Sequence, residues 1–157
     1  MMLNFKKKIM NIPEIKISLS FDKKVKKSEL RTITDAQSCV DVLREVFNKD
    51  TFDWTEEVVM LCLNRANKVV GFYKVSSGGL SSCILDPRVI FTIALNCGAT
   101  SIILSHNHPS GNTTPSVQDK DITKKVKEAG KLLDIGLLDH IILTDDNYYS
   151  FMEEGIL

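Results

Sequence analysis

One short stretch of the chain concentrates residue types that could bind a metal ion. His106 and His108 are two positions apart, and side chains two positions apart in an extended segment point to the same side. A Pro-Ser-Gly turn then leads toward a predicted helix that carries Asp119 in its first turn. Two histidines, one carboxylate and a water form a four-coordinate site with one exchangeable position, an arrangement expected of catalytic rather than structural zinc.

Each half of this pattern also has an ordinary structural interpretation. A histidine near the end of a strand is more often a hydrogen-bonded structural residue than a ligand. Ser116 and Asp119 match the Ser-x-x-Asp form of a plain helix N-terminal capping box. His-x-His followed by Ser-x-x-Asp after seven residues is more demanding than either half, so the combined pattern favours a metal site.

Alternating apolar residues and β-forming runs predict the strands around this stretch. Turn residues separate the runs at 57–63 and 68–75, which favours a hairpin. The predicted strands cover residues 14–21 (an edge strand), 57–63, 68–75, 101–105, 139–144 and 148–152 (a return edge strand). Residues 76–82 are expected to form a flexible connector.

Helical periodicity predicts three helices between these strands. A capping box at residues 34–37 begins the first, the Asp86-Pro87 pair begins the second, and Ser116 begins the third. The helices are predicted over residues 35–48, 86–97 and 116–133. The mixed order of helices and strands predicts an α/β fold in which helices flank a mixed β-sheet.

The composition excludes several classes of protein. At 157 residues, 43% hydrophobic and 25% charged, the chain has the size and composition of one globular domain. No apolar run approaches the ~20 residues that cross a bilayer, and residues 1–10 lack the apolar centre of a secretory signal. We therefore expect a cytoplasmic protein with no membrane partner. The four cysteines are dispersed and are expected to behave as small buried hydrophobes.

The charges are unevenly distributed along a chain whose net charge is zero. Residues 1–31 contain nine Lys and Arg residues against three acidic ones. Such a segment can be a nucleic-acid-binding arm, but a solvated terminus is the more common case. We divide the chain into a basic N-terminal segment, 1–30, that includes the predicted edge strand, and a folded domain, 31–157.

The motif His106-Asn-His108, seven residues, Ser116-Val-Gln-Asp119 resembles the signature of the JAMM (MPN-type) metalloproteases, and within that superfamily it is most similar to the RadC branch. The resemblance extends over roughly residues 30–157 and includes the stretches 87–91, 102–111 and 137–142. It implies a fold similar to that of the cytidine deaminases. The chain lacks the His-x-Glu and Pro-Cys-x-x-Cys motifs of the deaminases, which disfavours base deamination.

The resemblance also implies roles for the motif residues. His106, His108 and Asp119 would be the ligands of one zinc ion per chain, with water as the fourth ligand. The Ser116 hydroxyl would donate a hydrogen bond to the developing oxyanion. His140, in the middle of an apolar strand, is expected to be a buried hydrogen-bonded residue or a support for the site rather than a ligand.

In JAMM enzymes a glutamate on an upstream strand serves as general acid and base, and Glu56 and Glu57 are the candidates here. Comparison with the RadC pattern favours Glu56. Strand alternation does not decide between them, because both faces of the following run are apolar. The chosen glutamate would accept a proton from a water acidified by the metal and pass it to the leaving amine.

The reaction that the resemblance implies is hydrolysis of a peptide or isopeptide amide, so a protein or peptide substrate is expected. The alternative is an accessory protein associated with DNA repair, which binds DNA or a protein partner and has a non-catalytic metal site. A catalytically silent scaffold is a third hypothesis, disfavoured because all the motif residues are present. Asn107 and residues 110–113 are expected to be turn residues that shape the metal loop without direct chemistry. The sequence predicts no oligomeric state.

Overall fold

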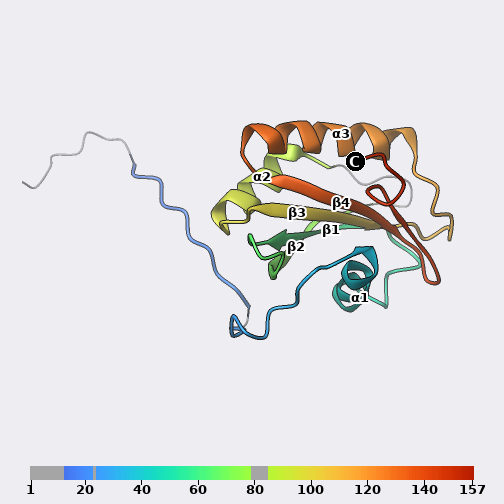
Figure 1. Ribbon diagram of the computed structural model, residues 1–157, viewed down its shortest axis with the longest axis horizontal. Coiled ribbons are helices and arrows are strands. Elements are labelled where there is room, and N and C mark those ends of the chain that lie inside the picture. The colour runs from blue at the N-terminus through green and yellow to red at the C-terminus, as the bar shows by residue number, and fades with distance from the viewer. Residues whose placement is uncertain (1–12, 23, 79–84) are drawn as a thin grey trace, which may run out of the picture.

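Five strands form one mixed sheet in the computed structural model (Figure 1), which describes residues 13–22, 24–78 and 85–157. The strand order is β2-β1-β3-β4-β5, in which β3 and β4 are parallel and the other neighbours antiparallel. The strands are β1 (Glu57–Leu63), β2 (Val69–Ser77), β3 (Ser101–Asn107), β4 (Gly136–Leu143) and β5 (Tyr148–Ser150). The predicted α/β architecture is confirmed.

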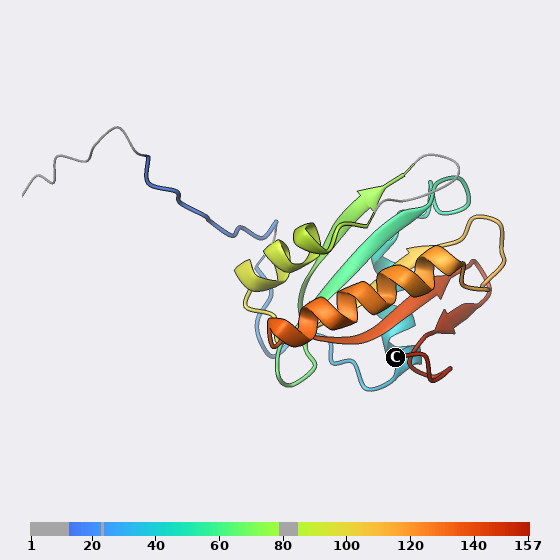
Figure 2. The ribbon, with the colours of Figure 1, turned by 90° about the horizontal axis from the view of Figure 1, so that it is seen from above.

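Three helices cover the two faces of this sheet. They are α1 (Ala36–Val46), α2 (Pro87–Asn96) and α3 (Val117–Leu132). Helix α1 lies against one face, and α2 and α3 lie side by side over the other, as the two perpendicular views show (Figures 1 and 2). Among the described residues, none of the helices has the length and apolar character needed to span a membrane.

Strand alternation distributes the core between these two faces. In β1, Val59 and Leu61 belong to the apolar cluster around α1, whereas Met60 and Cys62 belong to the cluster around α2 and α3. Both clusters are buried, because a strand covered by helices on both sides has no face left for solvent. The side to which a residue of β1 or β3 points therefore decides which helix it meets.

The helix starts are close to those that the sequence predicts. Asp86 caps α2 with Pro87 at the first helical position, and Ser116 caps α3. The prediction for α1 is wrong by one residue, because the cap is Asp35 and not Thr34. The Asp35 carboxylate accepts a hydrogen bond from the backbone N–H of Ser38, and the Ser38 hydroxyl oxygen accepts one from the backbone N–H of Asp35.

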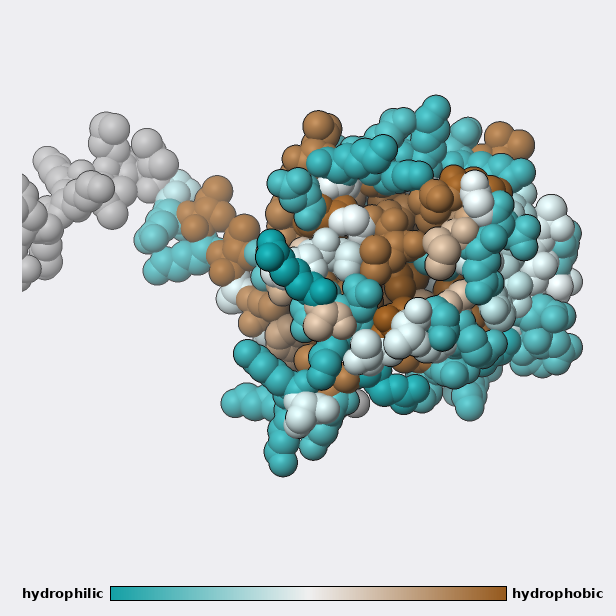
Figure 3. Space-filling view, in the orientation of Figure 1, coloured by the Kyte–Doolittle hydropathy of each residue, from teal (hydrophilic) through white to brown (hydrophobic). Residues whose placement is uncertain are grey.

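The edge strand predicted over residues 14–21 is wrong. These residues form neither helix nor strand, and their apolar side chains are exposed in a segment that extends away from the domain (Figures 1 and 3). Alternation sets which way side chains would point, but a strand exists only through ladder hydrogen bonds to a neighbour. Residues 1–12, which carry part of the basic segment, lie outside the described residues.

The connector predicted at 76–82 overlaps the end of β2. Residues 76 and 77 are part of that strand, and residues 79–82 lie outside the described residues. Of the four cysteines, Cys39 and Cys62 are buried as expected, Cys97 is half-buried, and Cys83 lies outside the described residues.

Candidate metal centre

The two histidines and the aspartate of the motif meet where β3 ends and α3 begins. Strand β3 is two residues longer than predicted, so His106 is part of the strand and pairs with Val58 of β1 and Ile142 of β4. His106 belongs to the same face as Leu104, which packs in the cluster under α2 and α3. The first turn of α3 crosses this face and brings Asp119 to the histidines.

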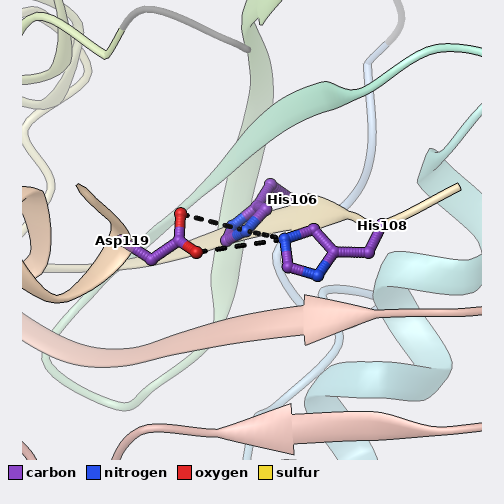
Figure 4. Close-up of side chains that lie close together, drawn as sticks. All are labelled: His106, His108 and Asp119. Carbon is purple, nitrogen blue, oxygen red and sulfur yellow. Dashed lines mark hydrogen bonds and ion pairs between the residues drawn. The ribbon is translucent and has the colours of Figure 1, made fainter. Parts of the chain in front are cut away.

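The side chains of these three residues point toward a common centre (Figure 4). His106 Nε2 lies 3.0 Å from His108 Nε2 and 3.4 Å from Asp119 Oδ1, and His108 Nε2 lies 3.9 Å from Asp119 Oδ2. One potential ligand atom from each residue lies within 4.8 Å of the others. His106 is 1% exposed, so its end of the centre lies below the protein surface.

The loop after β3 determines how His108 presents its ring. Gly111 has a φ of 78°, in the left-handed region that favours glycine, and the loop places the carbonyl oxygen of Asn112 at 2.6 Å from His108 Nδ1. A carbonyl oxygen only accepts, so Nδ1 of the neutral ring donates and Nε2 carries the lone pair. This lone pair and the Asp119 carboxylate point to one place. An imidazole nitrogen and a carboxylate oxygen are ligands of a divalent cation such as zinc.

The Ser116–Asp119 pair also forms the predicted capping box. The Asp119 N–H donates to Ser116 Oγ at 3.1 Å, and both the backbone N–H and the hydroxyl of Ser116 donate to Asp119 Oδ2 at 2.7 Å. The cap fixes the carboxylate with Oδ1 toward His106. Because the Ser116 hydroxyl is engaged with Asp119, its role as an oxyanion donor stays a prediction.

The two candidate glutamates have different surroundings. Glu57 is 7% exposed, and its carboxylate lies 3.3 Å from Lys74 Nζ and accepts from the Thr51 hydroxyl at 3.2 Å. Glu56, just before β1, lies beside the histidine–aspartate centre. Because Val58 pairs with His106 in antiparallel strands, the residue two before Val58 is brought next to the residue two after His106, which is His108.

Glu56 lines two cavities that flank the centre. One, of about 170 Å³, is lined by Glu56, Val58, Leu85, His106, Gln118, Asp119 and Ile122. The other, of about 280 Å³, is lined by Trp54, Glu56, His108, Pro109, Ser110, Asn112 and Thr114. Burial raises the pKa of Glu56 above its usual value, while nearby His108 acts to lower it and Asp119 to raise it. A glutamate with a raised pKa next to a cavity is suited to accepting and returning a proton.

Asn107 is a site residue whose contacts the sequence does not reveal. The expectation that it belongs to the turn of the metal loop is wrong, because it is the last residue of β3 and is fully buried. Its amide nitrogen donates to the carbonyl oxygens of Phe52 and Thr55, and its amide oxygen accepts from the Glu57 N–H at 2.7 Å. These bonds hold the segment that carries Glu56 against β3. The sequence offers one signal for this residue, strand alternation, which indicates that Asn107 points away from the two histidines but not which groups it contacts.

His140 is buried and hydrogen-bonded, as predicted. It lies on β4, is 0% exposed, and its Nε2 is 2.9 Å from Nδ1 of His106. It therefore contacts the back of the His106 ring, on the side away from Asp119, and is not one of the three converging residues.

Comparisons with known proteins find similarity over most of the chain. The family model described as RadC-like JAB domain matches residues 33–156. A UPF0758 protein of Flavobacterium johnsoniae is 43% identical over 128 residues, which are 82% of this chain and 55% of that protein. A UPF0758 protein of Clostridium perfringens is 39% identical over 135 residues, which are 86% of this chain and 59% of that protein. The chain thus spans little more than half the length of these relatives, and their names state no activity.

Proposed function

The chain belongs to the family of RadC-like JAB domains, and from this premise we propose that it is a zinc-dependent hydrolase of peptide or isopeptide amides. The observation that carries the proposal is the convergence of His106, His108 and Asp119 beside cavities that Glu56 also lines. A ligand set of two imidazoles and one carboxylate leaves a coordination position for solvent, as catalytic zinc sites do.

The three converging residues would hold the ion through His106 Nε2, His108 Nε2 and Asp119 Oδ1. The ion would act as a Lewis acid that polarises the amide carbonyl and acidifies a water. The capping box would keep the carboxylate of Asp119 in place, because Oδ2 already accepts two hydrogen bonds from Ser116. The site then needs little rearrangement to bind the ion.

Glu56 would move the proton. Its carboxylate would accept a proton from the attacking water and deliver it to the nitrogen of the leaving amine. Glu57 is less suited to this role, because its carboxylate is already paired with Lys74 and Thr51. Ser116 remains our candidate for the oxyanion donor, and this role requires its hydroxyl to turn from Asp119 Oδ2 toward the substrate carbonyl.

The two cavities supply a path for an extended substrate. Because Glu56 lines both, a peptide that occupies both would place one of its amides beside Glu56 and the histidines. Trp54 borders the larger cavity and is 75% exposed, so its ring is available to a substrate side chain. The smaller cavity has apolar walls from Val58, Leu85 and Ile122.

The experiment is to digest a library of proteome-derived and isopeptide-linked peptides in ¹⁸O-labelled water with the zinc-loaded chain. We expect new carboxyl ends that carry ¹⁸O, which disappear with a chelator and with Glu56→Gln but persist with Glu57→Gln. Labelled products that persist in Glu56→Gln would contradict the proposed role of Glu56. A library that stays uncut by zinc-loaded protein would contradict the hydrolase proposal.

The DNA-associated alternative depends on the basic N-terminal segment. Part of that segment, residues 1–12 and 23, lies outside the described residues, and nothing in the described residues favours DNA over a peptide. The alternative predicts an affinity for DNA that falls steeply with salt and disappears when residues 1–30 are removed.

A further inference from the structure

A chain of three hydrogen bonds, two of them buried and the third partly buried, leads from the candidate metal centre into the core and back to α3. His106 Nδ1 lies 2.9 Å from His140 Nε2, and His140 Nδ1 lies 2.6 Å from the Thr123 hydroxyl. The Thr123 hydroxyl lies 2.6 Å from the carbonyl oxygen of Asp119. His106, Thr123 and His140 are all buried, so these contacts are shielded from competing solvent.

The chemistry of the four groups fixes the direction of every bond. The Asp119 carbonyl can only accept, so the single hydroxyl proton of Thr123 is donated to it. The Thr123 oxygen must then accept from Nδ1–H of His140. A neutral imidazole that carries its proton on Nδ1 has a lone pair on Nε2, so this atom accepts from Nδ1–H of His106.

His140 must be neutral for this chain to exist, and its surroundings favour the neutral form. Its ring stacks on Phe151 at 4.9 Å with an interplanar angle of 15°, and its two nitrogens contact a hydroxyl and an imidazole rather than a carboxylate. Burying a charged ring without an anionic partner is costly.

We propose that His140 and Thr123 are positioning residues that lock His106 in the Nδ1–H tautomer, so that Nε2 presents its lone pair to the metal before the metal binds. The inference rests on the proposed metal site. In the metal-bound site both rings would carry their proton on Nδ1, since His108 faces the Asn112 carbonyl and His106 faces His140, and the two Nε2 atoms, 3.0 Å apart, would then share the ion rather than a proton. The hydrogen-bond chain also ties the His106 ring on β3 to the backbone of Asp119 on α3.

The first test is the tautomer of His106 in the metal-free chain, read from long-range ¹H–¹⁵N NMR correlations at pH 7.5. Wild type should show the proton on Nδ1 of His106. In His140→Phe, which keeps a ring against Phe151, this preference should be lost, and in His140→Gln, whose amide oxygen can accept, it should be restored. A His106 proton on Nε2 in wild type, or an unchanged tautomer in His140→Phe, would overturn the proposal.

The second test is zinc affinity, measured by competition with a chromophoric chelator. Loss of such a supporting bond weakens metal binding about 10–100-fold, so His140→Phe should bind zinc more weakly by that factor and His140→Gln less so. Thr123→Val should also weaken binding, whereas its control Thr123→Ser, which keeps the hydroxyl, should not. A zinc affinity equal to that of wild type in all four variants would contradict the proposal. Because the tautomer is measured without metal, a wild type that binds no zinc refutes the proposed function separately.

Discussion

Glu56 and Glu57 are adjacent in the chain, yet their carboxylates contact different parts of the molecule. Glu57 pairs with Lys74 and Thr51, whereas Glu56 lines the cavities beside His106 and His108. Neighbouring side chains near the start of a strand point to opposite faces, and only one of these faces leads to the candidate metal centre. This difference separates the proposed proton carrier, Glu56, from a structural ion pair.

The paired variants Glu56→Gln and Glu57→Gln test this assignment. Loss of a positioned general base costs about 10²–10⁴-fold, so Glu56→Gln should lower kcat by that factor while zinc content, measured by mass spectrometry, stays at one per chain. Glu57→Gln should keep kcat near the wild-type value and lower the free energy of unfolding, because Lys74 loses its buried partner. The reverse pattern would make Glu57 the base.

Asn107→Ala should affect both stability and catalysis. It leaves the Glu57 N–H and the carbonyl oxygens of Phe52 and Thr55 without their partner, and we expect the free energy of unfolding in urea to fall by about 1–3 kcal/mol. The kcat should fall as well, because the segment that carries Glu56 loses its attachment to β3. The control is Asn96→Ala at the exposed end of α2, which should change stability by no more than about 0.5 kcal/mol. Similar effects from the two variants would contradict this role of Asn107.

Trp54→Ala tests whether the larger cavity receives the substrate. The ring is exposed, so its removal should leave the unfolding free energy within about 0.5 kcal/mol of wild type. Loss of an aromatic contact should raise KM about 3–10-fold with little change in kcat. Leu132→Ala, an apolar change at an exposed position at the far end of α3, is the control. An unchanged KM in Trp54→Ala would place the substrate elsewhere.

Asp139→Asn tests a buried carboxyl in the core of the domain. Burial raises the pKa of Asp139 above its ordinary value of 3.8, although hydrogen bonds from Ser150, Met152 and His140 act in the opposite direction. Between 3.8 and the raised pKa the folded chain binds more protons than the unfolded one, so this group makes stability fall as pH rises. Asparagine does not titrate.

The measurement for Asp139 is the unfolding free energy of wild type and Asp139→Asn in urea at pH 4, 5, 6 and 7. Wild type should lose stability relative to the variant as pH rises, by no more than about 1.4 kcal/mol per pH unit. Comparing the two proteins cancels the titration of carboxyls such as Asp35, whose lowered pKa acts in the other direction. A difference that is constant over this range, or that changes in the opposite sense, would contradict the assignment.

The parts of the site that the sequence predicts depend on local rules. Strand alternation places His106 and His108 on one side, and the capping box places Asp119 in the first turn of α3. The choice between Glu56 and Glu57 is not local, because it depends on which face of β1 lies under α2 and α3. The contacts of Asn107 with residues fifty or more positions away are likewise tertiary. The failed edge strand at 14–21 shows that alternation without a pairing partner does not make a strand.

The most direct test of the account is the anomalous difference map at the zinc absorption edge from crystals of the zinc-loaded chain, with His108→Ala as the control. We predict one strong peak per chain, in bonding contact with His106 Nε2, His108 Nε2 and Asp119 Oδ1, that is absent in the variant. A peak at other residues, or none at this centre in wild type grown with excess zinc, would contradict it.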